Sequence, residues 1–388
     1  MNFLKDLLKS NRMLYKIYCY VGSFILKVLG IFIKTDENLI LFVVYGGQRY
    51  DDSPRFMYEY MKSHEKYSNY KYVWAFIDPE QHTQVKDKKV CINSLEYFIV
   101  ALRAKYWLTN SSATRGLNFK KKTTVNIFTP HGMTGIKTLV LGEKNKSFRL
   151  CFNEKFDYIV IEGKKEISLL NEAWHTTGDE FLSVGLPRND ELVNADNNHI
   201  LELKKKLGIP SDKKVILYAP TFREYKRNSK LETYLAPPFD FDKWYEKLGD
   251  EYVLLLTAHY EVAKLMDVPD DHPFVINAFK YPYINDLILV SDMLISDYSS
   301  IIFDYSIIGK PIISYAYDYD VYQQHRGVYP GYENIFSHGI FRTEDEVIKH
   351  IQTMDYDQEC LFTKKNIRDE YIINYGNATE LAVKKIFG

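Results

Sequence analysis

Short apolar runs alternate with helical patterns along most of the chain, beginning at residue 39. In the segments 54–62 and 94–103, apolar residues recur at helical spacing. This alternation predicts βαβ units and parallel sheets. The runs form two series, and we interpret the polar stretch 189–207 between them as an interdomain link with a lead-in helix. The predicted strands are 39–45, 72–77, 106–109, 125–129 and 158–161, then 215–219, 253–258, 274–276, 293–295 and 312–315.

Polar clusters directly follow many of the predicted strands. In open α/β sheets, ligands bind outside the carboxyl ends of the strands, so two facing sheets would gather these clusters around one cleft. The pattern therefore predicts an α/β fold of GT-B type, with two Rossmann-like domains and parallel sheets facing a central cleft. Neither a G-x-G-x-x-G nor a Walker A sequence is present. The clusters are Gly46-Gly47-Gln48, Asn110-Ser111-Ser112, Pro130-His131-Gly132, Pro220-Thr221-Phe222-Arg223, His259 and Asp297.

The N-terminal segment 1–38 differs from the rest of the chain. Apolar residues recur there at helical intervals among basic residues, and Asp6 is the single acid before position 35. This composition predicts a basic amphipathic helix on an anionic membrane surface. A transmembrane helix is one alternative, although Lys16 and Lys27 interrupt the apolar run early for a span. A helix packed on its own domain is another, and a signal peptide fits poorly because no small-residue cleavage site follows.

Composition limits the remaining possibilities. The 388 residues are enough for two domains, and the 46% of hydrophobic residues can form large cores. The net charge of -1 gives no argument for nucleic-acid binding. Four scattered cysteines without a C-x-x-C pair predict neither a disulfide framework nor a zinc site, and they fit a reducing cytoplasm. We predict a membrane-associating segment 1–38, Rossmann-like domains 39–195 and 196–365, and a C-terminal helix 366–388 that can cross back to the first domain.

The stretch 295–304 carries the strongest candidate chemistry. A short apolar run is followed by Ser296-Asp-Tyr-Ser-Ser300, which supplies helix N-cap residues, and then by apolar residues at helical spacing. Hydroxyl groups and free backbone N–H groups at a helix N-terminus can hold a phosphate without a metal. A capped helix with no ligand is the alternative reading of the same pattern.

The wider pattern around this stretch resembles that of the CDP-glycerol glycerophosphotransferase family, which includes teichoic-acid primases and polymerases and related capsule polyol-phosphate transferases. The resemblance covers about residues 40 to 385, and it is strongest at 215–330 and 185–190. The residues that carry it are Asp297-Tyr-Ser-Ser300, Phe303-Asp304, Lys310-Pro311, Tyr315, Tyr317-Asp318 and Arg326-Gly327.

Further motifs match this family in part. Pro130-His131-Gly132 stands where the family usually has Trp-His-Gly. Tyr218-Ala-Pro-Thr-Phe-Arg223 resembles a Tyr-Ala-Pro-Thr-Trp-Arg element, and Leu186-Pro-Arg-Asn-Asp190 resembles a Pro-Arg-Asn-Asp turn. His259 corresponds to an Arg-x-His element that lacks its arginine here.

The resemblance implies a role for each matching residue. His131 would be the general base, because an imidazole suits proton removal near neutral pH; from the residues alone, a structural histidine remains the alternative. Arg188 would touch the substrate or brace the hinge, and Asp304 would bind ribose or order the loop. The nucleotide and diphosphate would be bound by Arg223, His259, Asp297, Ser299, Ser300 and Asp304, and the acceptor would be bound or positioned by Gly132, Arg188, Asn110 and Arg115.

The implied reaction is the transfer of a polyol phosphate from a CDP-polyol to an acceptor hydroxyl, with release of CMP. The donor would be CDP-glycerol or CDP-ribitol, and the acceptor a lipid-linked saccharide or polyol phosphate at the cytoplasmic face of the membrane. No acidic pair with metal-ligand spacing stands out, so we expect no cofactor and no metal. A GT-B glycosyltransferase that uses a nucleotide sugar, and an inactive scaffold for a membrane assembly, are the alternatives.

Overall fold

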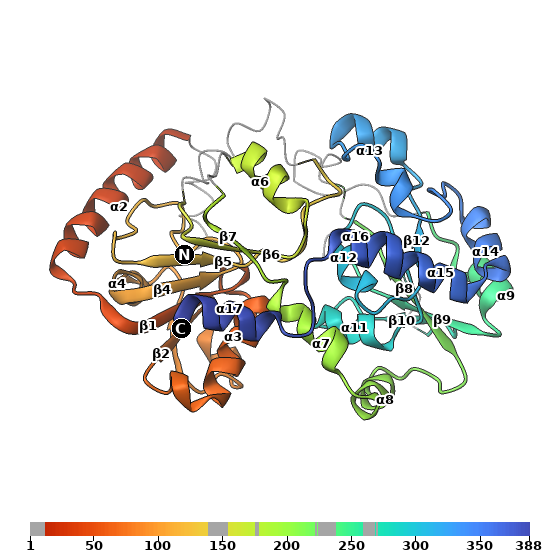
Figure 1. Cartoon of the computed structure of the whole chain (residues 1–388), viewed down its shortest axis with the longest axis horizontal. Helices are drawn as coiled ribbons and strands as arrows, with labels where there is room; N and C mark the ends of the chain where they lie inside the picture. The colour runs from red at the N-terminus through yellow and green to blue at the C-terminus, as the bar shows by residue number, and fades with distance from the viewer. Residues whose placement is uncertain are drawn as a thin grey trace.

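Two parallel sheets, one in each of two lobes, form the frame of the molecule (Figure 1). In the described part of the chain, the first sheet has the strand order β3-β2-β1-β4-β5-β6-β7 and the second has the order β10-β9-β8-β11-β12. Neighbouring strands are parallel throughout both sheets, which confirms the predicted α/β class. The computed structural model describes residues 12–138, 154–174, 178–221, 223, 238–258, 268 and 271–388.

The first sheet contains two strands that we did not predict, β3 and β7. Each has only one buried residue and lies at an edge of the sheet, so neither shows the apolar run that marks an inner strand. The other five strands follow the predicted runs. The strands are β1 (Asp36–Val43), β2 (Lys71–Phe76), β3 (Lys88–Cys91), β4 (Ala104–Thr109), β5 (Val125–Phe128), β6 (Tyr158–Ile161) and β7 (Phe181–Ser183).

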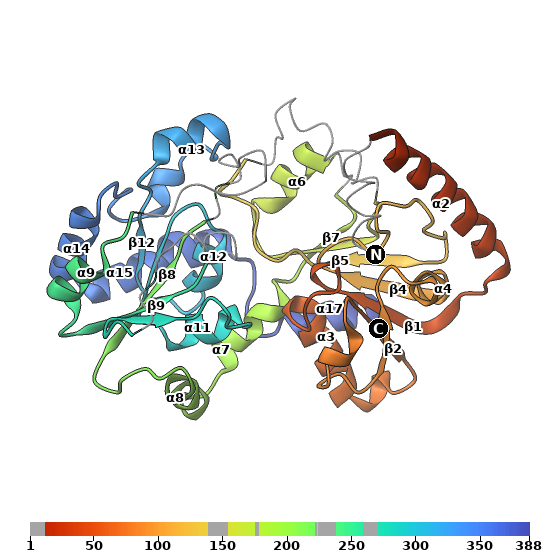
Figure 2. The same cartoon turned by 180° about the vertical axis from the view of Figure 1, so that it is seen from behind.

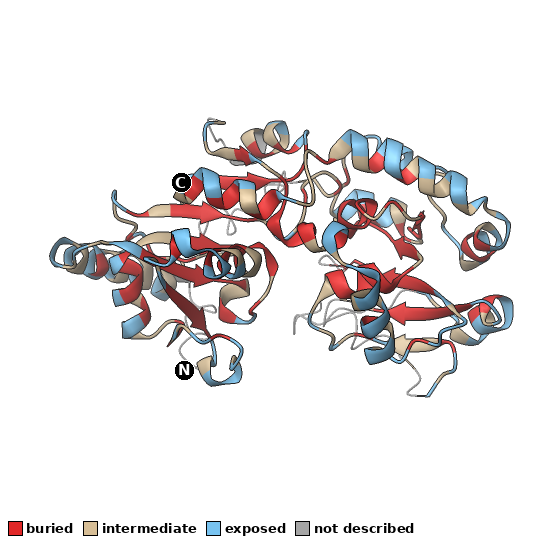
Figure 3. Ribbon diagram, turned by 60° about the horizontal axis from the view of Figure 1, so that its bottom comes forward, coloured by how far each residue is buried: buried red, intermediate tan, exposed pale blue. Residues whose placement is uncertain are grey.

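Both faces of the first sheet are covered. Successive residues of a strand point to opposite faces, and in β1 the side chains of Ile40 and Phe42 pack in one core while Leu41 and Val43 pack in another. The α3 side of the sheet belongs to the first core and the α2 and α4 side to the second. Figure 3 shows the strands as a buried layer, with exposed residues on the outer sides of the helices. The helices are α2 (Arg12–Phe32), α3 (Asp52–Ser63), α4 (Leu95–Arg103) and α6 (Glu166–Trp174).

The second lobe follows the same plan. Its inner strands are buried along most of their length, and helices cover both faces of the sheet. It is joined to the first lobe through the turn Pro187–Asp190 and the helices α7 (Glu191–Asn194) and α8 (Asn197–Lys206). Its elements are β8 (Lys214–Ala219), α9 (Phe241–Leu248), β9 (Tyr252–Leu256), β10 (Val275–Asn277), α11 (Ile284–Val290), β11 (Met293–Ser296), α12 (Ile301–Ser306), β12 (Ile312–Ser314), α13 (Tyr319–His325), α14 (Glu344–Thr353) and α15 (Tyr356–Phe362).

The C-terminal segment returns to the first lobe, where α17 (Ala378–Phe387) lies beside α3 in both views (Figures 1 and 2). Three residues of α17 belong to the first core, namely Ala382, Val383 and Ile386. The sequence pattern predicted one continuous helix for this segment, but the structure divides it into several elements. A π-helical turn (Thr363–Arg368) and the short α16 (Asp369–Tyr371) come first, and then an extended stretch crosses Gly185 so closely that a side chain there would meet the carbonyl of Asn374 at 2.2 Å.

The N-terminal helix α2 packs on the first lobe along one face. Leu26 is buried, and Gly22 and Gly30 allow close approach to Leu117 and Leu102. The opposite face exposes a series of large apolar side chains. By length and composition alone, α2 is long and apolar enough to cross a membrane, with a mean hydropathy of 1.4 over Met13–Phe32 and 17% of that window buried. The exposed apolar residues are Met13, Leu14, Ile17, Tyr20, Val21, Phe24, Ile25, Val28, Ile31 and Phe32.

Candidate active site

The loop that carries His131 follows β5 and bridges the two lobes. Thr129 extends the sheet by donating its N–H to the carbonyl of Thr109 at 2.9 Å. Beyond His131, Lys137 pairs with Val328 of the second lobe in an isolated antiparallel bridge. The hydroxyl of Thr138 also donates to the carbonyl of Arg326 at 3.0 Å. Contacts with both lobes therefore fix the position of the loop.

His131 keeps an exposed surface, yet protein groups surround its ring. The ring of Tyr45 lies beside it, with the centroids 5.9 Å apart. Burial lowers the pKa of the imidazole below its usual 6.5, and Asp52 acts in the opposite sense while Arg188 supports the lowering. At neutral pH the ring is therefore uncharged and can accept a proton.

Gly132 brings the two lobes into direct contact. A side chain at this position would meet the hydroxyl oxygen of Ser300 at 2.3 Å and its Cβ atom at 3.1 Å. A guanidinium nitrogen of Arg188 lies 3.8 Å from the same point. The structure thus places the His131-Gly132 loop of the first lobe against the Ser299-Ser300 pair of the second.

Ser299 and Ser300 form the open part of the second-lobe motif. Both are partly exposed, and they immediately precede α12. The Ser299 hydroxyl accepts the N–H of Ile301 at 3.3 Å, whereas Ser300 makes no capping bond with its side chain. Within the described residues, the backbone N–H groups of Ser299 and Ser300 have no acceptor. Hydroxyl and amide donors are therefore available beside His131 for an anionic oxygen.

The Pro187–Asp190 turn is an interdomain joint, and its three polar side chains all bind other segments of the chain. Arg188 pairs with Asp304 of α12 at 2.6 Å. Asn189 donates to the other oxygen of Asp304 at 2.8 Å. Asp190 accepts the N–H groups of Ala378 and Thr379, both at 2.8 Å, and so caps α17. This joint ties together both lobes and the C-terminal helix.

Asp304 lies inside this joint. It is 3% exposed, and Arg188 and Asn189 occupy its two oxygens. Burial raises the pKa of its carboxyl group, while Arg188 acts in the opposite sense. Of the two predicted roles, this geometry matches the ordering of the loop and offers no open oxygen for ribose.

A buried network behind His131 includes residues that the sequence analysis missed. Asp52 accepts the hydroxyl of Tyr45 and the amide of Asn110, both at 2.8 Å. Asn110 in turn accepts the N–H of Tyr45 at 2.7 Å. The guanidinium of Arg188 lies 3.9 Å from Asp52. Asn110 thus holds both Tyr45 and Asp52 in place. No local signal marks Asp52, because its partners come from distant parts of the chain.

A cavity of about 50 Å³ lies between the lobes next to this network. Tyr45, Asp52 and Arg188 line one side, and Tyr283 and Asn285 of the second lobe line the other. The buried Asn285 donates its amide to the carbonyl of Arg188 at 2.6 Å, which adds another interdomain bond. The cavity therefore adjoins the groups that surround His131.

Glu166 supports the His131 loop from the side of α6. Its carboxylate accepts the N–H groups of Thr134, Glu162 and Gly163 at 2.7, 2.8 and 2.7 Å. Burial raises its pKa to about 7, although these hydrogen bonds act in the opposite sense. Sequence reasoning missed Glu166, because an acid in the first turn of a helix is common and carries no functional signal by itself.

The position of Arg223 requires a correction. We predicted that it grips phosphate oxygens, but its guanidinium is 1% exposed and bound to protein. It makes two bonds to Asp318, at 2.8 and 2.9 Å, and one to Asp297 at 2.9 Å. Asp297 also accepts the N–H groups of Thr221 and Tyr298. Arg223 and Asp297 thus hold the strand end that precedes the two serines, and neither side chain is open to a phosphate.

One predicted residue, Arg115, lies apart from this arrangement. Arg115 adopts a φ of 56° and donates to Asn93 at 2.9 Å, and it approaches Gly46 in the loop after β1. It is therefore near Tyr45, outside the buried network. His259 lies outside the described residues.

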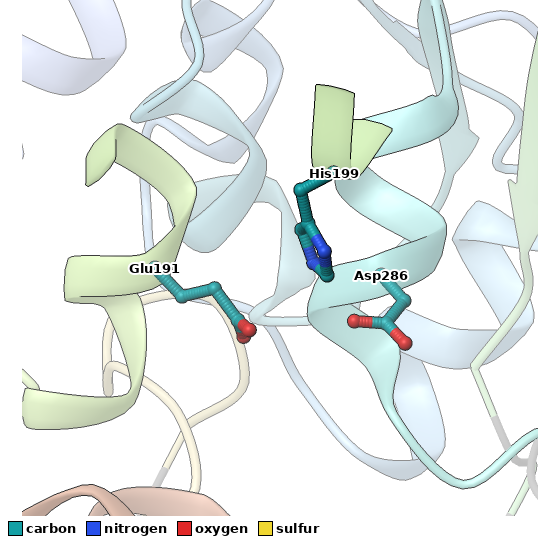
Figure 4. A group of neighbouring side chains, drawn as sticks. All are labelled: Glu191, His199 and Asp286. Atoms are coloured by element: carbon teal, nitrogen blue, oxygen red, sulfur yellow. The ribbon is translucent and has the colours of Figure 1, made fainter. Parts of the chain in front are cut away.

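One group of side chains in the described part of the chain could hold a metal ion. Glu191, His199 and Asp286 point toward one another from α7, α8 and α11 (Figure 4), and their ligand atoms lie within 4.8 Å of one another. Asp286 also accepts the hydroxyl of Tyr281 at 2.5 Å. The same three groups serve equally well as an electrostatic contact between helices, and we assign them no step in the chemistry at His131.

Comparisons with known proteins agree with the fold and with the motifs. A family model described as CDP-Glycerol:Poly(glycerophosphate) glycerophosphotransferase matches residues 25–388. The teichoic acid poly(glycerol phosphate) polymerase of Staphylococcus epidermidis is 34% identical over 335 residues, which are 82% of this chain and 46% of that protein. The chain thus spans about half the length of that relative.

One further relative and one solved structure are similar to this chain over most of the length compared. The teichoic acid glycerol-phosphate transferase of Staphylococcus aureus is 33% identical over 336 residues, which are 82% of this chain and 85% of that protein. A solved structure of a variant of the wall teichoic acid polymerase TagF superposes with a TM-score of 0.81 at 31% identity, covering 93% of this chain and 92% of that one. This likeness confirms the predicted two-domain GT-B arrangement.

Proposed function

Because the chain belongs to the CDP-glycerol:poly(glycerophosphate) glycerophosphotransferase family, we propose that it transfers glycerol phosphate from CDP-glycerol to a hydroxyl group of a membrane-linked acceptor. CMP is the other product. The observation that carries the proposal is the contact of Gly132 with Ser300, which sets a neutral imidazole on one lobe against free hydroxyl and amide donors on the other. A base and a phosphate-binding group on opposite sides of a reacting phosphorus suit an in-line transfer.

In the proposed reaction, His131 takes the proton of the acceptor hydroxyl. The acceptor oxygen forms a bond to the β-phosphorus of the donor, and the bond from that phosphorus to the bridging oxygen breaks. CMP leaves with the electron pair of that bond. The lowered pKa of His131 keeps the ring in its basic form at neutral pH.

Charge on the transferred phosphate would be met by the hydroxyl and N–H groups of Ser299 and Ser300. Arg223 and Asp297 would act behind them by fixing the end of β11. Arg188 and Asp304 would act similarly by fixing the approach of the two lobes. In this view, substrate contacts come from the few open groups, and the buried ion pairs set their spacing.

The helix α2 and the names of the relatives support a proposal for the acceptor and the place of action. We propose that the protein acts at the cytoplasmic face of the membrane in the synthesis of a teichoic-acid type polymer, with α2 lying on the bilayer surface. One face of α2 packs on the first lobe while the other exposes apolar side chains. A helix held along one side in this way fits an interfacial position better than a span. A capsule polymer is the other product class that the family resemblance suggested.

The test measures CMP release from CDP-glycerol and from CDP-ribitol in the presence of a glycerol phosphate oligomer as acceptor. His131→Ala should keep CDP-glycerol binding by calorimetry and reduce turnover by about 10²-fold or more, the usual scale for a lost general base. His131→Gln should fail in the same way, because an amide cannot take the proton. His64→Ala, at an exposed histidine on the first lobe, is the matched control.

Each alternative predicts a different outcome of this assay. A glycosyltransferase would release a nucleoside diphosphate from a nucleotide sugar and leave CDP-glycerol intact. An inactive scaffold would release no CMP from any donor. If a folded His131→Ala protein turned over at the parental rate, His131 would be structural and the proposed mechanism would be wrong.

A further inference from the structure

A large groove lies between α2 and the chain segments around β5, apart from the site at His131. Its volume is about 730 Å³, which is within the range of sites for small molecules and much larger than one phosphate group needs. Lysine is the commonest residue in its lining. These residues are Lys16, Lys27, Lys120, Lys121, Lys122 and Lys155.

Most of these lysines have no ion-pair partner in the part of the chain that the structure describes. Lys16, Lys27, Lys122 and Lys155 are exposed, and none of them has a carboxylate partner among the described residues. Lys120 pairs with Asp157 at 2.9 Å. Four free ammonium groups around one groove create a positive potential that favours a ligand with several negative charges.

The one acidic residue in the lining does little to offset these charges. Glu154 is bound by the hydroxyl of Ser112 at 2.6 Å, the hydroxyl of Thr114 at 3.3 Å and the amide of Asn126 at 3.2 Å. Burial raises the pKa of its carboxyl group. Protein groups therefore bind the carboxylate of Glu154, and it contributes little negative charge to the groove.

The floor of the groove is firmly built. The N–H of Asn118 donates to the hydroxyl of Ser23 in α2 at 2.8 Å. Lys121 donates to the carbonyls of Ile33 and Leu102, at 2.6 and 3.1 Å, and so joins the end of α2 to the end of α4. The groove is a preformed feature of the first lobe, because these bonds do not involve any ligand.

The groove opens beside the apolar surface of α2. Tyr20 and Phe24 line the groove and are also 77% and 68% exposed, so they belong to both surfaces. If the apolar face of α2 lies on a bilayer, the groove stands at the height of the lipid headgroups. Thr114, another lining residue, belongs to the same loop as Asn110, which binds Tyr45 beside His131. The lining of the groove and the network beside His131 therefore share one loop of the first lobe.

We propose that this groove binds the phosphodiester groups of the acceptor chain and so feeds the acceptor's end toward His131. The proposal rests on the proposed function, in which the acceptor is a poly(glycerophosphate) attached to the membrane. Such a chain carries one negative charge per repeat, which matches a row of unpaired lysines, and a groove of this size accommodates more than one repeat.

The test measures binding of a soluble glycerol phosphate hexamer by fluorescence anisotropy at low salt. Lys122→Gln combined with Lys155→Gln should weaken binding about tenfold, on the usual scale for two exposed charge contacts. The slope of log Kd against log salt should also decrease, because fewer counterions are released on binding. Lys205→Gln combined with Lys349→Gln removes two exposed charges from the second lobe and should leave the Kd unchanged.

Two further measurements separate the possible outcomes. CDP-glycerol binding by calorimetry should be equal in the groove variant and the parent, and the KM for the hexamer should rise with little change in kcat. Loss of binding to vesicles of phosphatidylglycerol and phosphatidylcholine, with unchanged hexamer binding, would make the groove a phospholipid headgroup site and overturn the proposal. Equal hexamer binding by both lysine variants would also overturn it. Because hexamer binding needs no turnover, a parent protein that releases no CMP refutes the proposed function separately.

Discussion

Replacing Gly132 with alanine tests whether the two lobes must meet closely at the active site. The new methyl carbon would lie 2.3 Å from the hydroxyl oxygen of Ser300, and something must move by at least about 0.7 Å to restore the 3.0 Å closest approach. The hydroxyl can rotate, but the Cβ atom of Ser300, at 3.1 Å, then limits any further relief. Either response takes the Ser300 hydroxyl away from its position beside His131.

We expect Gly132→Ala to lower kcat by about 10²-fold, the usual effect of misplacing a reacting group by about 1 Å. The loss of stability should be about 1–3 kcal/mol, as for other overpacked contacts. Because the φ of Gly132 is not in the left-handed region, alanine adds no backbone strain there. The assays are CMP release for the rate and urea denaturation for the stability.

A double variant identifies the cause of this effect. In a Ser300→Ala background there is no hydroxyl for the new methyl group at position 132 to displace. Only the 3.1 Å contact with the Cβ atom of residue 300 remains, so Gly132→Ala should cost little further activity there. Gly135→Ala is the control in the same loop, since a side chain there meets the flexible end of Met133 at 3.2 Å and Phe303 at 3.4 Å. A parental rate for Gly132→Ala, or an equal loss in both backgrounds, would refute the reasoning.

Three more predictions concern His131, Arg223 and α2. The pKa of His131 is lowered, so its basic form persists below neutrality. The kcat should therefore stay constant from pH 8 to 7 and fall only below about pH 6.5. A fall that begins above pH 7 would exclude His131 as the general base. Arg223→Ala should lower the free energy of unfolding by about 3–5 kcal/mol, because it leaves the buried carboxylates of Asp297 and Asp318 without their cation. A loss below about 1 kcal/mol in urea denaturation would contradict this. Ile17→Gln with Ile31→Gln should weaken sedimentation with anionic vesicles and preserve CDP-glycerol binding, and unchanged sedimentation would argue against an interfacial α2.

Strands and helices that are buried along most of their length show an apolar sequence pattern and could be predicted from it. Elements that depend on contacts with distant parts of the chain show no such pattern and could not be predicted. The inner strands are apolar because both of their faces are covered, so β1 and β11 were identified from their apolar runs. The edge strands β3 and β7 have one buried residue each and left no such signal. Likewise, the tail was predicted as one helix, because nothing local marks the stretch where it crosses the first lobe.

The candidate site shows the same limit. His131 was identified from its flanking proline and glycine together with the family resemblance, and the serines from their place between a strand and a helix. The burial of Arg223 depends on its ion pair with Asp318, which lies 95 residues later in the sequence. No local sequence pattern reveals such a distant pairing. Asp52 reaches the site only through tertiary contacts with Asn110 and Tyr45.

The return of α17 to the first lobe has a consequence for synthesis on the ribosome. The first core is incomplete until Ala382, Val383 and Ile386 have been made, although its last strand ends at Ser183. At about 5–20 residues per second, the intervening stretch takes roughly 10–40 s to translate. During that time α17 does not cover the apolar surface beside α3, and we expect the N-terminal half of the nascent chain to offer this surface to chaperones.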